Sequence, residues 1–415
     1  MSAASDRFRT RYRHAASSAD YLAKWSAAAL GFSIPISTAL DNLLLGLVLL
    51  GWLAGGDYRE KMAAIRRNPV ALLALTLFTL LLLGTLHGLA PPAERLDFLG
   101  KYKDLLFIAL LITLFRDATT WRCALLGFML AMLLTLLLST VAGLGILPEA
   151  AFARNPVSNT VVFKLHITQN FLMAYFAFVL ASAARQQPAG SRRVWLALAS
   201  AAAIGNTLFL VHGRTGHIVL AVLLIFFFVR WLRWKGLALG LLAVASLSVA
   251  AYNTSPVFHD RSMKASDEYQ LWRGGAPVAE DNSIGSRMQW YRAGAAIVGE
   301  HPLIGVGTGG FRQAYATRAE DATAGPRNPH NEYLLLAIQL GPLGPLLLLA
   351  LFYGQWRFAC RLPSTLERDL AHGLVLAMAT GCLFNSFLID HAEGLFFAWM
   401  SALLFAGLNR QDVRT

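Results

Sequence analysis

Three basic side chains in this sequence have the types and surroundings to do chemistry. Arg214 lies in the turn His-Gly-Arg-Thr-Gly between two apolar segments, Arg287 in Gly-Ser-Arg-Met-Gln-Trp, and His330 in Asn-Pro-His-Asn-Glu-Tyr. A guanidinium group binds phosphate oxygens bidentately, and a neutral imidazole accepts a proton. These residue types suit the binding of a polyanion such as pyrophosphate together with general-base catalysis on an attacking hydroxyl group.

The local sequence predicts that His330 lies in the first turn of a helix. Asn328 is a good N-cap residue, and Pro329 is favoured at the first helical position. The positive end of the helix dipole disfavours an imidazolium ion, so we expect a neutral imidazole that can act as a base. An interfacial histidine that only satisfies a loop carbonyl is an equally good interpretation of these residues.

The two arginines also have alternative interpretations. The glycines beside Arg214 allow a ligand to approach closely, although an arginine there can also simply reach lipid headgroups. Arg287 lies in the first turn of a predicted amphipathic helix, where free N–H groups favour an anion. The alternative for Arg287 is a solvated helix face, and the local sequence leaves both alternatives open.

Three further residues are candidate supporting groups. Lys164 precedes an apolar segment and can add positive charge near a lipid phosphate, Asp390 ends another and can orient a base or an acceptor, and Asn331 adjoins His330. There is no Asp-x-Asp pair, and no His, Cys or carboxylate residues have metal-ligand spacing. We therefore predict no metal site and no cofactor.

The stretch 305–310 is glycine-rich but lacks the Gly-Lys-Ser/Thr ending of a phosphate-binding loop, so we expect a flexible turn.

Composition decides which elements must position these residues. Apolar residues make up 56% of the 415 residues and charged residues only 14%, and mean hydropathy is +0.50. A soluble domain is nearer about 25% charged, so an ordinary cytosolic enzyme is excluded. Runs long enough to cross a bilayer predict an all-α polytopic membrane protein with about twelve transmembrane helices. They lie near 22–38, 40–54, 70–87, 105–115, 121–145, 166–184, 194–211, 216–231, 236–252, 331–356, 370–389 and 392–408.

The distribution of charge predicts the orientation of these spans. The net charge of +12 comes from 36 Lys and Arg against 24 Asp and Glu. The basic residues are densest in short connections such as 230–235, which the positive-inside rule places in the cytoplasm. Both termini are then cytoplasmic, no cleaved signal peptide is expected, and nucleic acid is not predicted as a partner.

One long connection on the outer side divides the predicted chain. We expect nine spans in 1–252, a loop in 253–329, and three spans with a short cytoplasmic tail in 330–415. Apolar residues between 284 and 298 recur every three or four positions, and 311–318 can form a second short helix. The loop is therefore predicted to carry amphipathic helices that lie on the outer membrane face.

At these positions the sequence resembles the O-antigen ligase family, within the wider O-antigen ligase and polymerase superfamily. The resemblance rests on His-Gly-Arg-Thr-Gly around Arg214, the Ser-Arg segment at Arg287, the stretch 300–311, and Pro-His-Asn-Glu-Tyr at 329–333. Each motif is short, but their order, on a twelve-span map with one large outer loop before the tenth span, is fairly specific. The resemblance covers most of the chain from about 70 to 408.

The resemblance implies a fold similar to that of lipid-dependent glycosyltransferases (GT-C-like) in the bacterial inner membrane. It implies transfer of O-antigen polysaccharide from undecaprenyl pyrophosphate to lipid A–core oligosaccharide at the periplasmic face, without metal and with inversion. By resemblance, Arg214 and Arg287 hold the pyrophosphate and His330 activates the acceptor. Asp390 matches a family acid only loosely.

Other functions remain open from the sequence. An O-antigen polymerase shares the donor but extends another lipid-linked glycan, and a protein glycosyltransferase acts on pilin. From a different class, a polytopic flippase or transporter would do no chemistry. Such a carrier would normally show ionisable residues at the centres of its spans, and these are nearly missing here.

Overall fold

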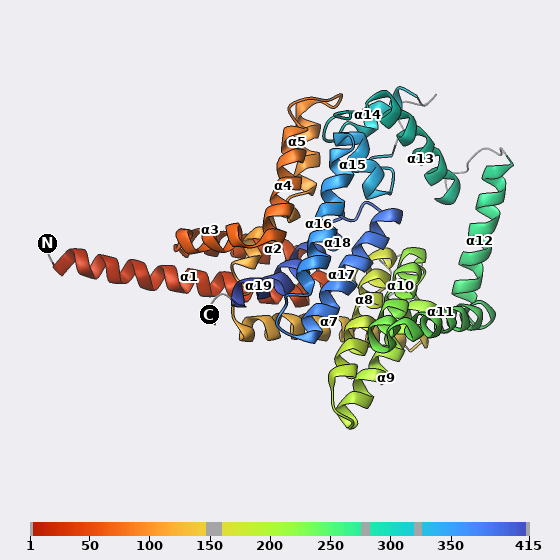
Figure 1. The fold of residues 1–415 in the computed structure, drawn as a ribbon, viewed down its shortest axis with the longest axis horizontal. Coiled ribbons are helices and arrows are strands. Elements are labelled where there is room, and N and C mark those ends of the chain that lie inside the picture. The colour runs from red at the N-terminus through yellow and green to blue at the C-terminus, as the bar shows by residue number, and fades with distance from the viewer. Residues whose placement is uncertain (1–2, 147–159, 275–282, 319–325, 412–415) are drawn as a thin grey trace.

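The computed structural model describes residues 3–146, 160–274, 283–318 and 326–411, and all regular structure in these ranges is helical (Figure 1). In chain order the helices are α1 (Ala3–Ile36), α2 (Thr38–Ala54), α3 (Tyr58–Arg67), α4 (Pro69–Leu83), α5 (Pro92–Lys101), α6 (Asp104–Ile112), α7 (Ala118–Gly143), α8 (His166–Gln186), α9 (Ser191–Gly205), the π-helical turn η2 (Asn206–Leu210), α10 (Arg214–Leu232), α11 (Trp234–Thr254), α12 (Pro256–Arg273), α13 (Ser283–Glu300), α14 (Phe311–Ala316), α15 (Glu332–Leu340), α16 (Leu343–Ala359), α17 (Thr365–Phe384), α18 (His391–Phe405) and α19 (Gly407–Gln411).

Several helices begin at residues whose side chains cap free N–H groups. The Asn68 side-chain oxygen accepts hydrogen bonds from the N–H groups of Val70 and Ala71, and Pro69 occupies the first position of α4. Asp117 caps α7 in the same way through the N–H of Thr120. Because a capped helix end leaves fewer unpaired donors, polar residues between apolar runs fix where these helices start.

The chain is a polytopic integral membrane protein. Among the described residues, six helical stretches are long and apolar enough to cross a membrane: α7, α8, α9 with η2, α10, α11, and α18 with the residues up to Asn409. The pair α2 and α3, bent by 115°, makes a seventh if it counts as one span. Each of the twelve predicted ranges contains helix, but the shorter helices do not by themselves establish twelve crossings, and that number stays a prediction.

The core of the bundle lies around α8 and α18. The candidate span of α18 is 89% buried, whereas that of α11 is only 17% buried, so α11 leaves most of its apolar surface for lipid. Phe128 of α7 packs against Phe396 and Trp399 of α18, and Tyr175 of α8 packs edge-on against Phe396. The buried indole N–H of Trp399 donates to the carbonyl of Ala27, which ties α18 to α1.

The predicted span 331–356 is interrupted, which corrects the expectation of one continuous helix. α15 ends at Leu340, and α16 begins at Leu343 after Gly341 and Pro342. Gly341 has φ +63°, and a Cβ there would lie 2.2 Å from the carbonyl oxygen of Leu303. The close approach of the chain around Leu303 therefore requires glycine, and proline cannot donate the next helical hydrogen bond.

The prediction that residues 305–310 form a flexible turn is wrong. Backbone N–H groups of Val306 and Gly307 donate to carbonyls at the end of α15, at 2.8 and 3.0 Å, and the N–H of Thr308 donates to Gly84 at 3.0 Å. The glycines permit this because Gly307 has φ +82° and lies against the carbonyl of His87. The stretch fastens the outer loop to the ends of α4 and α15.

The outer segment contains more helix than expected. The amphipathic pattern between 284 and 298 corresponds to α13, and the short helix predicted near 311–318 corresponds to α14. An additional helix, α12, precedes them, and Figure 1 shows α12 (green) and α13 (teal) at one edge of the molecule. α12 packs on α13 and on η2, so the segment is anchored to the helices that carry the candidate site.

Candidate active site

One buried asparagine connects three of the elements that carry candidate residues. Asn385 follows the end of α17, and its side-chain oxygen accepts a long hydrogen bond of 3.5 Å from Nη2 of Arg287 on α13. Its amide nitrogen donates to Oγ1 of Thr215 at 3.0 Å, next to Arg214 at the start of α10. Asn385 thus joins α10, α13 and the α17–α18 connection, and sequence analysis missed it.

His330 lies outside the helix that it was predicted to begin. α15 starts at Glu332, because Asn331 is the cap and its side-chain oxygen accepts from the N–H of Leu334 at 3.0 Å. The predicted cap, Asn328, instead accepts from the backbone N–H of His330 at 2.9 Å. This turn gives His330 a positive φ of 52°, which directs the backbone away from a helical path.

The surroundings of His330 keep its imidazole neutral. The ring stacks on Trp290 of α13, with centroids 5.2 Å apart and an interplanar angle of 29°. The pKa of His330 is lowered from 6.5 to about 4, mainly because the ring is buried and also because the positive charge of Arg287 is near, while a hydrogen bond with Asn385 acts in the opposite direction. Desolvation and Arg287 therefore both favour the neutral form of the imidazole, whereas the prediction had relied on a helix dipole.

Arg214 has both an acidic partner and unused donors. Its Nη1 lies 3.3 Å from Oε2 of Glu268, a buried residue of α12 that also accepts the N–H of Ile284 at 3.1 Å. The Nε and Nη2 atoms of Arg214 are buried and have no hydrogen-bond partner among the described residues. Since buried donors are normally paired, these two atoms are suited to bind oxygen atoms of a ligand.

The structure brings Arg287 toward Arg214 and adds a third arginine. Burial lowers the pKa of Arg287, and repulsion from Arg214 contributes to this, while Tyr291 favours the charged form. Burial and the charge of Arg214 likewise lower the pKa of Arg261 on α12. Like charges repel at such a place, so the arrangement favours an anion that neutralises them.

Sequence analysis missed Arg261 because nothing in its neighbourhood distinguishes it from the other polar residues of the outer segment. The structure shows its role because Arg261 and Glu268 both belong to the helix α12. They are seven residues apart, which places both side chains on one face of that helix. The same face of α12 therefore contacts Arg214 through its ion pair with Glu268.

A cavity of about 580 Å³ opens beside His330. Its lining includes His330, Asn385, Asp390 and Lys164, so two of the three supporting candidates reach the same space as the candidate base. Burial raises the pKa of Asp390, and the neighbouring carboxylate of Glu393 raises it further.

Two of the supporting candidates already have structural partners. Lys164 forms a 3.2 Å ion pair with the buried carboxylate of Asp41 and donates to Thr38 at 2.8 Å, so its charge is compensated. Asn331 donates to the carbonyl of Leu383 at 3.1 Å in addition to capping α15. Asn331 therefore holds the loop that carries His330, and its polar atoms face backbone groups.

No group of three or more His, Cys, Asp or Glu side chains in the described ranges is arranged to hold a metal ion. The polar groups beside His330 and the arginines are amides, hydroxyls and a few carboxylates, including the neighbouring pair Asp390 and Glu393. The arrangement can bind an anion, keep an imidazole unprotonated, and hold a polar molecule in the adjacent cavity.

Comparison with known proteins agrees with this chemistry. A family model described as O-antigen ligase matches residues 196–349, from α9 to α16. The matched range includes Arg214, Arg287 and His330, and leaves Lys164, Asn385 and Asp390 outside. A comparison with curated proteins gives no match. Residues 196–349 therefore match an O-antigen ligase domain, and the rest of the chain lies outside this match.

Proposed function

We propose that the protein transfers O-antigen polysaccharide from undecaprenyl pyrophosphate to a sugar hydroxyl of lipid A–core oligosaccharide. The family supports the coarser statement, transfer of a lipid-linked glycan of the ligase or polymerase type. The observation that carries the proposal is the contact of Asn385 with Arg287 and Thr215, together with its hydrogen bond to His330. A candidate base and the helices of two candidate phosphate ligands thus meet at one amide.

In the proposed reaction the acceptor hydroxyl oxygen attacks the anomeric carbon of the donor sugar. His330 takes the hydroxyl proton, the new C–O bond forms, and the bond between the anomeric carbon and the pyrophosphate oxygen breaks. The lipid pyrophosphate leaves with the electron pair of that bond. Attack from the face opposite the leaving group inverts the anomeric centre, and no metal or second carboxylic acid is required.

Arg214 and Arg287 stabilise the charge that develops on the departing pyrophosphate. The free Nε and Nη2 atoms of Arg214 support this role, because they can form two charge-assisted hydrogen bonds. The hydrogen bond that Arg287 makes within the described residues is a long contact with the neutral amide of Asn385, which leaves its donors available to a substrate. Arg261 adds positive potential on the same side.

Bound pyrophosphate also improves His330 as a base. The charge of Arg287 is one cause of the low pKa of His330, and a polyanion beside Arg287 reverses that effect. The pKa of the imidazole therefore rises when the donor binds, which brings the base closer to the pH at which it works. The adjacent cavity leaves space beside His330 for the acceptor sugar.

The proposed setting is the bacterial inner membrane, with both termini in the cytoplasm and the site on the periplasmic side. The dense basic residues of 230–235 support this orientation. Two lipid-linked substrates can then reach the site from the same leaflet.

Reconstitution of the transfer tests the proposal. Purified protein in EDTA receives undecaprenyl-pyrophosphate O-antigen and lipid A–core, and the products are separated by size. With the wild type we expect lipopolysaccharide that migrates more slowly than the bare lipid A–core. His330→Ala should lower the rate by about 10²–10⁴-fold. The control is His301→Ala, which lies outside the site at the end of α13 and should have the normal rate. A lengthened donor with bare core would replace the proposal by polymerase activity, and a requirement for metal would contradict it.

A further inference from the structure

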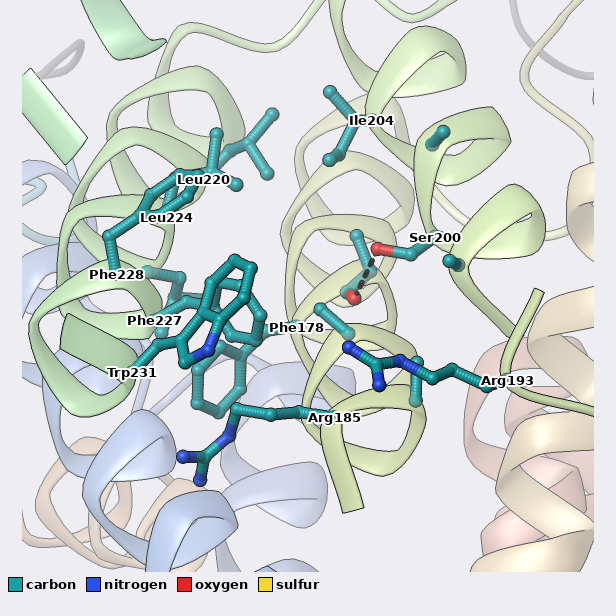
Figure 2. Close-up of a pocket in the computed structure, with 16 residues that line it drawn as sticks. Phe178, Arg185, Arg193, Ser200, Ile204, Leu220, Leu224, Phe227, Phe228 and Trp231 are labelled. Carbon is teal, nitrogen blue, oxygen red and sulfur yellow. Dashed lines mark hydrogen bonds between the residues drawn. The ribbon is translucent and has the colours of Figure 1, made fainter. Parts of the chain in front are cut away.

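A separate apolar slot lies between α8, α9 and α10, and His330 is not among the residues that line it. Its volume is about 300 Å³, and aliphatic and aromatic side chains from all three helices form its walls (Figure 2). The single hydroxyl group on the α9 wall, that of Ser200, donates to the carbonyl of Ala177 at 2.9 Å. The walls therefore present hydrocarbon and leave no hydrogen bond for a polar ligand to complete.

One end of the slot is basic. Figure 2 shows Arg185 and Arg193 beside Phe178 at this end, with Trp231 across from them and Ile204 and Leu220 at the other end. Arg185, Arg193 and Trp231 belong to the connections 185–193 and 230–235, which the sequence predicts to be cytoplasmic. Tryptophan and arginine are typical of the membrane–water interface, so the slot runs from the interface into the hydrocarbon region.

The two arginines differ in their partners. Arg185 forms an ion pair with Asp369, which also binds Nε of Arg230 at 2.8 Å. Arg193 is exposed, and in the described part of the chain it has no ion pair or hydrogen bond. The free positive charge at the mouth of the slot is therefore that of Arg193.

Two of the three helices that form the slot face lipid. The candidate spans of α9 and α10 are each only 28% buried, so lipid surrounds both walls. We propose that the slot binds one anionic phospholipid of the cytoplasmic leaflet, with an acyl chain between α9 and α10 and the headgroup phosphate on Arg193. This binding site is independent of the glycan transfer proposed above, since none of its lining residues belongs to the candidate active site.

The charge at the mouth predicts which lipid is preferred. Phosphatidylglycerol and phosphatidylcholine can place the same acyl chains in the slot, but choline adds a positive charge beside Arg193. A basic residue near a membrane surface favours an anionic lipid by about five-fold. We therefore expect the slot to bind both lipids and to prefer phosphatidylglycerol.

Native mass spectrometry of the full chain in detergent tests this site with two matched pairs of variants. Ala201 lines the slot and its neighbour Ala202 does not, although both are exposed on α9. Arg193 lines the mouth and Arg192 does not. Dioleoyl phosphatidylglycerol or dioleoyl phosphatidylcholine is titrated into wild type, Ala201→Phe, Ala202→Phe, Arg193→Gln and Arg192→Gln.

We expect Ala201→Phe to lose one tightly bound lipid of either kind, because the phenyl ring fills the slot, while Ala202→Phe retains it. Arg193→Gln should bind phosphatidylglycerol about five-fold more weakly and lose the preference for it over phosphatidylcholine, and Arg192→Gln should match wild type. Equal lipid retention by the two alanine variants would overturn the acyl-chain site. Equal phosphatidylglycerol affinity of the two arginine variants would overturn the role of Arg193. Unchanged thermal unfolding of each variant in detergent shows that it is folded.

Discussion

At the scale of single residues, the candidate site depends on one neutral amide between charged groups. Asn385 accepts from Arg287 and donates to Thr215, so it restrains a guanidinium and a helix start without cancelling any positive charge. A carboxylate at this position would neutralise the arginines that a pyrophosphate is proposed to bind. An amide provides the same hydrogen bonds and leaves the field of the arginines available.

We predict that Asn385→Ala lowers kcat/KM for the donor by about 10–100-fold, because lost hydrogen bonds at a buried site cost about 1–3 kcal/mol. Asn385→Asp should lose a similar factor for a different reason, since its carboxylate competes with the pyrophosphate. The same carboxylate stabilises the imidazolium form, so the acid limb of the pH profile moves to higher pH. Steady-state kinetics across pH measure both effects. Asn253→Ala, on exposed α11, is the control, and wild-type kinetics in Asn385→Ala would contradict the role of Asn385.

The low pKa of His330 has its own consequence for the reaction. The proposed base works as the neutral imidazole, so activity is present above its pKa and lost as pH falls through it. With the pKa lowered to about 4, kcat/KM should stay level from about pH 8 down to about pH 5. The limb of kcat should lie at higher pH, because bound pyrophosphate raises the pKa. If kcat/KM instead fell with a midpoint near pH 6.5, the ordinary pKa of histidine, the prediction that burial lowers the pKa of His330 would be wrong.

At the scale of elements, glycines determine how the outer segment is attached. Residues 305–310 thread between the ends of α4 and α15, and the backbone of Gly307 touches the carbonyl of His87. α15 in turn begins two residues after His330, at Glu332, so this attachment contributes to the position of the candidate base. Sequence analysis identified the glycines but assigned flexibility to them, because composition does not reveal which backbones they contact.

We predict that Gly307→Ala destabilises the protein by at least about 1–3 kcal/mol. Its φ is +82°, and a Cβ there would lie 2.2 Å from the carbonyl oxygen of His87, which cannot move easily because it is backbone. The control is Gly299→Ala near the end of α13, where a Cβ meets nothing within 4 Å. Thermal unfolding in detergent should show a lower midpoint for the first variant alone. Equal midpoints would contradict the rigid attachment.

At the scale of the whole molecule, the sequence predicted the helices much better than the contacts. Apolar runs and capping residues depend on local spacing, so the predicted spans contain helices. Asn385 could not be found in this way, because its partners Arg287 and Thr215 lie 98 and 170 residues away along the chain. α12 was missed because its polar sequence has no regular apolar spacing, and the start of α15 was misplaced because Asn328 and Asn331 are equally good caps.

The number of membrane crossings is the prediction that belongs to this largest scale. If the chain crosses the membrane twelve times, successive connections lie on alternate sides of it. Ser37, Leu86 and Leu303 are then on the periplasmic side, and Asp57 and Arg192 are on the cytoplasmic side. Four of these residues lie between helices, and Arg192 is the second residue of α9, so one cysteine at each position reports one connection from outside a helix or from its first turn. The native cysteines, of which two are exposed, are first replaced by serine or alanine.

With a membrane-impermeant maleimide and an intact inner membrane, we expect labelling at the three outer positions alone. All five should be labelled after the membrane is lysed, which controls for reactivity. The bent pair α2 and α3 makes Ser37 and Asp57 the most informative positions, since they lie at opposite ends of α2. Opposite sides for these two residues require α2 to cross as its own span. Protection of both before lysis would mean that α1 and α2 do not cross separately, and the twelve-span topology would be wrong.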